Sequence, residues 1–141
     1  MSHISDNSTL DTLLDHARSQ VWRGGLSGGT HRCKERNRTC GDEIAFELLL
    51  RGDRIADVRF TGRGCFLSQA TASLLCERIV QHTLSELRGL SAGELLGFDP
   101  ATVSPMRQRC CLLGIEALQN LLAAPERCRI SSTNQNEGGV S

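Results

Sequence analysis

Four side chains of this sequence are of the types that bind a metal ion or carry sulfur: Cys40, Asp42, Cys65 and Cys110. Gly41 separates the first two and permits a backbone angle at which both side chains can be offered to one ion. Three thiolates and one carboxylate would complete a tetrahedral zinc site, or would hold iron and sulfide with one oxygen ligand. Their separations fit no zinc-finger knuckle, so the tertiary fold must bring them together.

The composition indicates that the thiols are not paired in disulfides. The 141 residues include seven cysteines, an odd number, and we expect no export signal before them. We therefore expect a cytoplasmic protein whose clustered thiols are ligands, sulfur carriers or redox groups rather than disulfides. The formal net charge is zero and no apolar run approaches the roughly 20 residues that span a bilayer, so we expect neither a nucleic-acid nor a membrane partner.

The hydrophobic periodicity predicts elements whose ends carry these side chains. A helix over about residues 9–22 is followed by a Gly-rich and basic loop to Thr39, and then by an antiparallel hairpin over about residues 43–60. Further helices are expected over about 66–81, after the capping boxes at Thr83 and Ser91, and from Pro105 to about 124. The order predicts an α+β fold in which helices pack on one face of a small antiparallel sheet. A third strand is needed, but the sequence does not show where it lies.

One domain plus tails is the organisation expected for this length. We place a flexible N-terminus at residues 1–8, the domain at 9–124 and a disordered tail, rich in Ser, Asn and Gly, at 125–141.

Three motifs resemble the U-type iron–sulfur cluster scaffold family, which includes IscU, SufU and the N-terminal domain of NifU. They are residues 37–42 (NRTCGD), the segment 62–73 with its glycine–cysteine pair and small-residue helix, and residues 107–110 (RQRC). The resemblance implies that Cys40, Asp42, Cys65 and Cys110 surround one exposed site. It also implies that a pyridoxal-phosphate cysteine desulfurase delivers persulfide sulfur there, with Cys110 as first acceptor, and that the site holds a [2Fe–2S] cluster or zinc for recipient proteins.

The resemblance implies a scaffold rather than an enzyme, and two other hypotheses stay open. One is a zinc-dependent sulfurtransferase relay that binds no cluster, and the other is an interaction domain that has lost the chemistry.

The sequence departs from the family's motifs at two positions. Arg109 stands where the IscU branch has histidine, and Arg38 replaces a proline. The stretch 103–107 keeps one proline and one basic residue of the family's chaperone-recognition motif, which leaves recognition by the Hsp70 chaperone open.

Side chains near the four candidates have narrower expected roles. Arg38, Arg63 and Arg109 flank them and would offset the negative charge of a loaded site while lowering thiol pKa values. Adjacent residues of a helix point about 100° apart, so only one of Cys110 and Cys111 can face the site, and the register favours Cys110. We expect Cys76 in the core and no ligand role for the remaining cysteines and histidines, namely Cys33, Cys128, His3, His16, His31 and His82.

Overall fold

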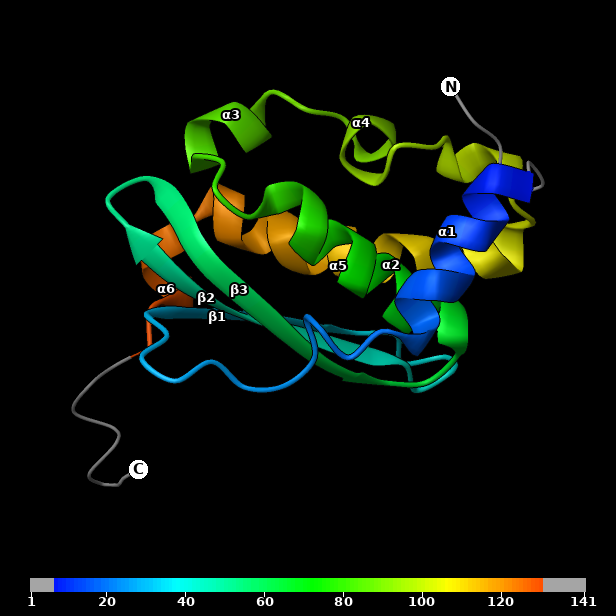
Figure 1. The fold of residues 1–141 in the computed structure, drawn as a ribbon, viewed down its shortest axis with the longest axis horizontal. Helices are drawn as coiled ribbons and strands as arrows, with labels where there is room; N and C mark the ends of the chain where they lie inside the picture. The colour runs from blue at the N-terminus through cyan, green and yellow to red at the C-terminus, as the bar shows by residue number, and fades with distance from the viewer. Residues whose placement is uncertain (1–6, 131–141) are drawn as a thin grey trace.

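A computed structural model describes residues 7–130 of the chain. Its sheet has three antiparallel strands in the order β1-β2-β3: β1 (His31–Arg36), β2 (Glu43–Arg51) and β3 (Arg54–Arg63). Two long helices, α2 (Phe66–Ile79) and α5 (Pro105–Ala123), lie together on one face of this sheet (Figure 1). The predicted α+β fold is therefore confirmed.

The hairpin of β2 and β3 supplies the sheet side of the core. Phe46 pairs with Phe60 and Leu48 with Val58, and all four side chains are buried against the helices, as the two-residue period predicts. A register shift between Leu49 and Leu50 interrupts the ladder.

The third strand lies inside the segment that the sequence predicted to be an irregular basic loop. In β1 only Cys33 is buried, so no run of alternating apolar residues marks the strand. Its pairing with β2 is supported by ion pairs across the strands, with 3.1 Å between Lys34 Nζ and Glu43 Oε2. Tertiary pairing, rather than local propensity, makes this segment a strand.

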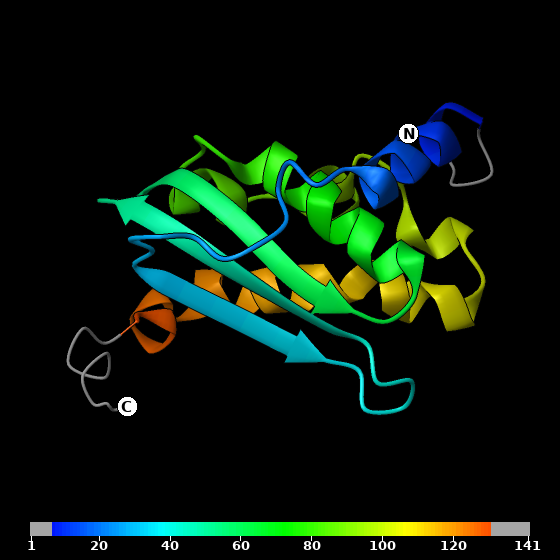
Figure 2. The ribbon, with the colours of Figure 1, turned by 60° about the horizontal axis from the view of Figure 1, so that its bottom comes forward.

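The N-terminal helix α1 (Asn7–Arg18) packs on α2 and ends earlier than predicted. Trp22 leaves the helix because its carbonyl accepts a 2.8 Å hydrogen bond from the Phe60 amide at the edge of β3. Val21, inside the predicted helix but beyond its observed end, is consequently 68% exposed. The chain then crosses the sheet face opposite to the long helices, where the Leu26 amide donates to Glu47 Oε1 at 2.9 Å (Figure 2).

Short helices connect and extend this core. Both predicted capping boxes are present, at the starts of α3 (Leu84–Arg88) and α4 (Ala92–Leu96), and a short 3₁₀ turn, η1 (Pro100–Thr102), precedes α5. A last helix, α6 (Pro125–Cys128), packs on β1, and the Ile130 amide donates to the Thr30 carbonyl at 2.8 Å. The expected disorder from residue 125 is therefore wrong for residues 125–130, because this pairing holds the segment to the sheet. Residues 1–6 and 131–141 lie outside the described part.

Candidate metal centre

Three chain segments meet at one end of the sheet and bring together three of the four predicted ligands. Asp42 ends the turn between β1 and β2, Cys65 lies between β3 and α2, and Cys110 lies in the second turn of α5. One donor atom of each lies within 4.8 Å of the other two, the only such group of three or more His, Cys, Asp or Glu side chains in residues 7–130. Two thiols and a carboxylate form a donor set suited to zinc or to an iron–sulfur unit.

Asp42 is the buried member of the group, and its carboxylate is hydrogen-bonded. Its Oδ2 accepts a 2.6 Å hydrogen bond from the Ser68 hydroxyl, and its Oδ1 accepts one of 3.3 Å from the Cys65 amide. Burial alone would raise the pKa of the Asp42 carboxyl, but hydrogen bonds from Ser68, Cys65 and Cys40 lower it below its ordinary value. The carboxylate is thus held ionised, in a fixed direction, beside the two thiols.

Gly64 makes room for that carboxylate. Its φ of +118° is a conformation that side chains disfavour, and a Cβ at this position would lie 2.2 Å from Asp42 Oδ1. A glycine directly before Cys65 is therefore a steric requirement of the centre.

Cys65 is the N-cap residue of α2, and its side chain makes no capping hydrogen bond. Its Sγ lies 3.5 Å from the Ser68 hydroxyl, one turn further along the helix.

Cys110 and Cys111 separate as the helical register predicts. Cys110 Sγ approaches Asp42 Oδ2 at 3.7 Å, whereas Cys111 is fully buried in the core. Burial, together with the neighbouring Cys65 thiol, raises the pKa of Cys110. A cation among these three groups would offset the mutual repulsion of their ionised forms.

Cys40 lies outside the 4.8 Å group, at the exposed tip of the turn. The turn is fixed from Asn37, whose carbonyl accepts a 2.7 Å bond from the Gly41 amide and whose Oδ1 accepts a 3.0 Å bond from the Thr39 amide. Gly41 has a φ of +81°, as its place between Cys40 and Asp42 suggested.

The three predicted arginines do not share one position. Arg63 points to the outer face of the sheet and pairs with Glu43, at 3.3 Å between Nη2 and Oε1. Arg38 and Arg109 instead line a groove between the β1–β2 turn and α5.

Ser68 was not among the predicted site residues, but it is the polar group in closest contact with the donor set. Its position three residues after Cys65 on a helix is the signal that could have identified it.

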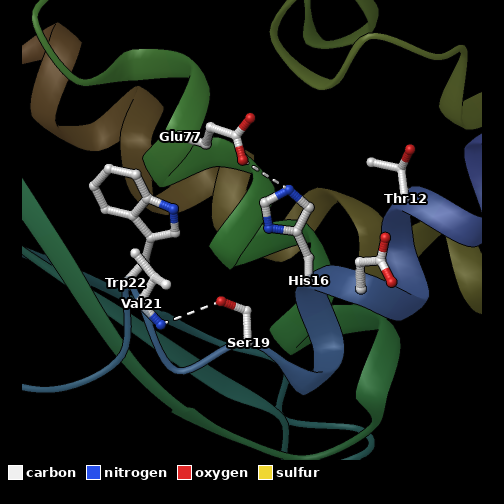
Figure 3. A pocket seen from close by; sticks show the side chains of 7 residues that line it. Thr12, His16, Ser19, Val21, Trp22 and Glu77 are labelled. Carbon is white, nitrogen blue, oxygen red and sulfur yellow. Dashed lines mark hydrogen bonds and ion pairs between the residues drawn. The ribbon is translucent and has the colours of Figure 1, made fainter.

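A second polar cluster lies between α1 and α2, away from the thiols. Figure 3 shows His16 with Glu77 and, on the chain that leaves α1, Trp22. His16 Nδ1 is 2.8 Å from the Ser73 hydroxyl and its Nε2 is 3.1 Å from Glu77 Oε1. Because Ser73 is fully buried, these groups hold α1 on α2 and do not present a nucleophile to solvent.

The cysteines outside the site occupy the places expected of packing residues or incidental thiols. Cys76 is fully buried, and its surroundings raise its pKa by desolvation. Cys33 is also buried, and Cys128 is half-buried beside β1.

A family model, the NifU-like N-terminal domain, matches residues 11–127. The chain belongs to this family. The iron–sulfur cluster assembly scaffold protein IscU of Thermotoga maritima is 32% identical over 130 residues, which cover 79% of this chain and 90% of that protein. The zinc-dependent sulfurtransferase SufU of Bacillus subtilis is 28% identical over 145 residues, covering 87% and 98%.

Solved structures agree with this membership. A SufU protein from Fervidobacterium islandicum, assigned to iron–sulfur cluster assembly in the SUF system, superposes with a TM-score of 0.66 at 28% identity and covers 79% of this chain and 94% of its own. The resemblance found in the sequence motifs is thus confirmed for this NifU-like domain. Within its described part, no helix is long and apolar enough to cross a membrane.

Proposed function

We propose that this NifU-like domain is a scaffold for iron–sulfur cluster assembly, which accepts persulfide sulfur and holds a [2Fe–2S] cluster or zinc. The observation that carries the proposal is the meeting of Asp42, Cys65 and Cys110 from three separate segments. Cys40, whose thiol is close enough to the Asp42 carboxylate to lower its pKa, would complete a set of four. The domain would act in the cytoplasm, where thiols stay reduced.

Sulfur would arrive from a pyridoxal-phosphate cysteine desulfurase and leave as part of a cluster for recipient proteins. In the first step the Cys110 thiol, whose pKa is raised in the free site, loses its proton to solvent, and the resulting thiolate attacks the outer sulfur of the donor persulfide. The donor's sulfur–sulfur bond breaks, a new one forms on Cys110, and the donor cysteine leaves as a thiolate, so no external oxidant or reductant is consumed. Cys65 and the fixed Asp42 carboxylate lie beside the sulfur so delivered.

The zinc-dependent relay is the second candidate, favoured by the similarity to SufU over nearly its whole length and by Arg109 in place of a histidine ligand. Metal analysis and the visible absorption spectrum of protein isolated without air distinguish the two. A scaffold shows iron, labile sulfide and a visible chromophore after incubation with desulfurase, cysteine, ferrous iron and dithiothreitol, which supplies the electrons that reduce persulfide sulfur to sulfide. A relay keeps zinc and shows none.

Cys65→Ser tests whether either ion is held at this site. We expect its metal content to fall from about one per chain to a small fraction, because the metal loses one of its thiolate ligands. Cys128→Ser is the matched control, since it removes a half-buried thiol outside the group and should bind metal like the parent. Full occupancy in Cys65→Ser would overturn the assignment of this centre.

A further inference from the structure

A groove of about 230 Å³ runs beside the candidate centre, between the β1–β2 turn and α5. Three arginines line it: Arg36 and Arg38 from the turn side, and Arg109 from the helix. Arg109 directly precedes Cys110 in the chain, and Arg38 lies two residues before Cys40. The groove is therefore lined by residues that neighbour both Cys110 and Cys40 in the chain.

The three guanidinium groups have no carboxylate partner among residues 7–130, whose ion pairs involve other cations. Glu116 is the one acidic residue that lines the groove, and none of the ion pairs within residues 7–130 joins it to the three arginines. Burial and the nearby Glu35 raise the pKa of the Glu116 carboxyl. Three like charges around one hollow repel each other, so an anion placed among them would be stabilised.

A second groove, of about 530 Å³, lies on the outer face of the sheet and is also lined by cationic side chains. It shares Arg36 with the first groove and adds Lys34 and Arg63, which both pair with Glu43. The two grooves together are lined by five cationic and two acidic side chains. We define the five as the basic band: Lys34, Arg36, Arg38, Arg63 and Arg109.

We infer that the basic band binds an acidic segment of a protein partner that addresses Cys110, and that carboxylates of this segment enter the groove of Arg36, Arg38 and Arg109. Only the role given to Cys110 rests on the proposed function. Guanidinium groups pair with carboxylates through two parallel hydrogen bonds, which gives both affinity and orientation. A band that runs through two grooves matches a peptide with several carboxylates better than a single small ion. Neither groove is lined by an aromatic side chain on which a nucleic-acid base could stack.

The test measures binding of a fluorescent hexaglutamate peptide to the full chain by anisotropy at low salt. We expect the triple variant Arg36→Gln/Arg38→Gln/Arg109→Gln to bind about tenfold more weakly or worse, and the parent to lose affinity as salt rises. The matched control is Arg18→Gln/Arg51→Gln/Arg127→Gln, which removes the same charge from exposed positions outside both grooves and should bind like the parent.

Three outcomes would overturn the inference. They are equal binding of the peptide by the triple variant and the parent, equal weakening in the control triple, and full displacement of the peptide by inorganic phosphate or single-stranded DNA at the peptide's own concentration. The metal content of each variant, measured in parallel, separates this inference from the proposed function. A chain that binds hexaglutamate through the band but holds no metal would refute the scaffold while leaving the docking surface in place.

Discussion

At the scale of single residues, Asp42 determines the geometry of the centre. Its carboxylate is 4% exposed and is fixed by Ser68 and by the Cys65 amide, so it has one direction in which to offer an oxygen. A hard oxygen among soft sulfurs is the weakest ligand for iron or zinc and the natural point of exchange. Replacement of Asp42 would therefore change how fast a bound cluster or zinc ion is released, rather than whether it binds.

The sequence identified the residue types of the site but not every position. Asp42, Cys65 and Cys110 were predicted and lie together, and Cys111 is buried as the helical register requires. The exposure of Cys40 and the role of Ser68 depend on the conformation of one turn and on contacts across segments. Neither leaves a periodic signal in the chain.

The two neighbouring cysteines of α5 give a test at this scale. Incubation with a cysteine desulfurase and cysteine should place persulfide on Cys110, because its thiol faces Asp42 while Cys111 has no exposed surface. Mass mapping should find the label in the parent and in Cys111→Ser, and should find it lost in Cys110→Ser. Label on Cys111 in the parent would mean that the buried thiol, not the facing one, is the acceptor.

At the scale of elements, the junction of β3 and α2 supports the site. Gly64 follows the last residue of β3, and Cys65 is the N-cap residue of α2. The Asp42 carboxylate occupies the space that a side chain at Gly64 would need. The hairpin and the long helices were predictable from their periods of two and 3.6 residues. The strand β1 was not, because its one buried residue cannot form a pattern and its stability comes from pairing with β2.

Gly64→Ala is therefore expected to release metal and to lower the free energy of unfolding by about 1–3 kcal/mol, through backbone strain and the clash with Asp42. Metal analysis and urea denaturation measure the two effects. Gly52→Ala is the matched control, since Gly52 also has a positive φ, of +63°, but a Cβ there would meet nothing within 4 Å. Metal content in Gly64→Ala equal to that of Gly52→Ala would show that Asp42 is not needed in its present place.

At the scale of the whole molecule, the core and the centre are separate. Buried residues of the sheet, α2 and α5 form one hydrophobic cluster, and the thiols of the site lie at its end. The single domain and the balanced charge were predictable from length and composition. The concentration of cations beside the site was not, because it depends on which loops and helices meet.

This separation predicts how the protein responds to loss of metal. Chelation of the zinc-loaded protein should lower its midpoint of thermal unfolding by about 5–15 °C, because an ion that binds only the folded state adds a few kcal/mol of stability. The far-UV circular dichroism at 25 °C should stay that of a folded α+β protein. Unfolding at 25 °C on chelation would show instead that the core depends on the ion, and an equal shift in Cys65→Ser would place the ion elsewhere.

The wide spacing of the ligands along the chain also sets an order of events during synthesis. Translation at about 5–20 residues per second delivers Cys110 several seconds after Cys65. During that interval a nascent chain carries Asp42 and Cys65 without the helix that closes the site, and Cys110 joins them only when α5 packs on the sheet. The three donor groups can therefore meet only after α5 has been synthesised and has packed on the sheet.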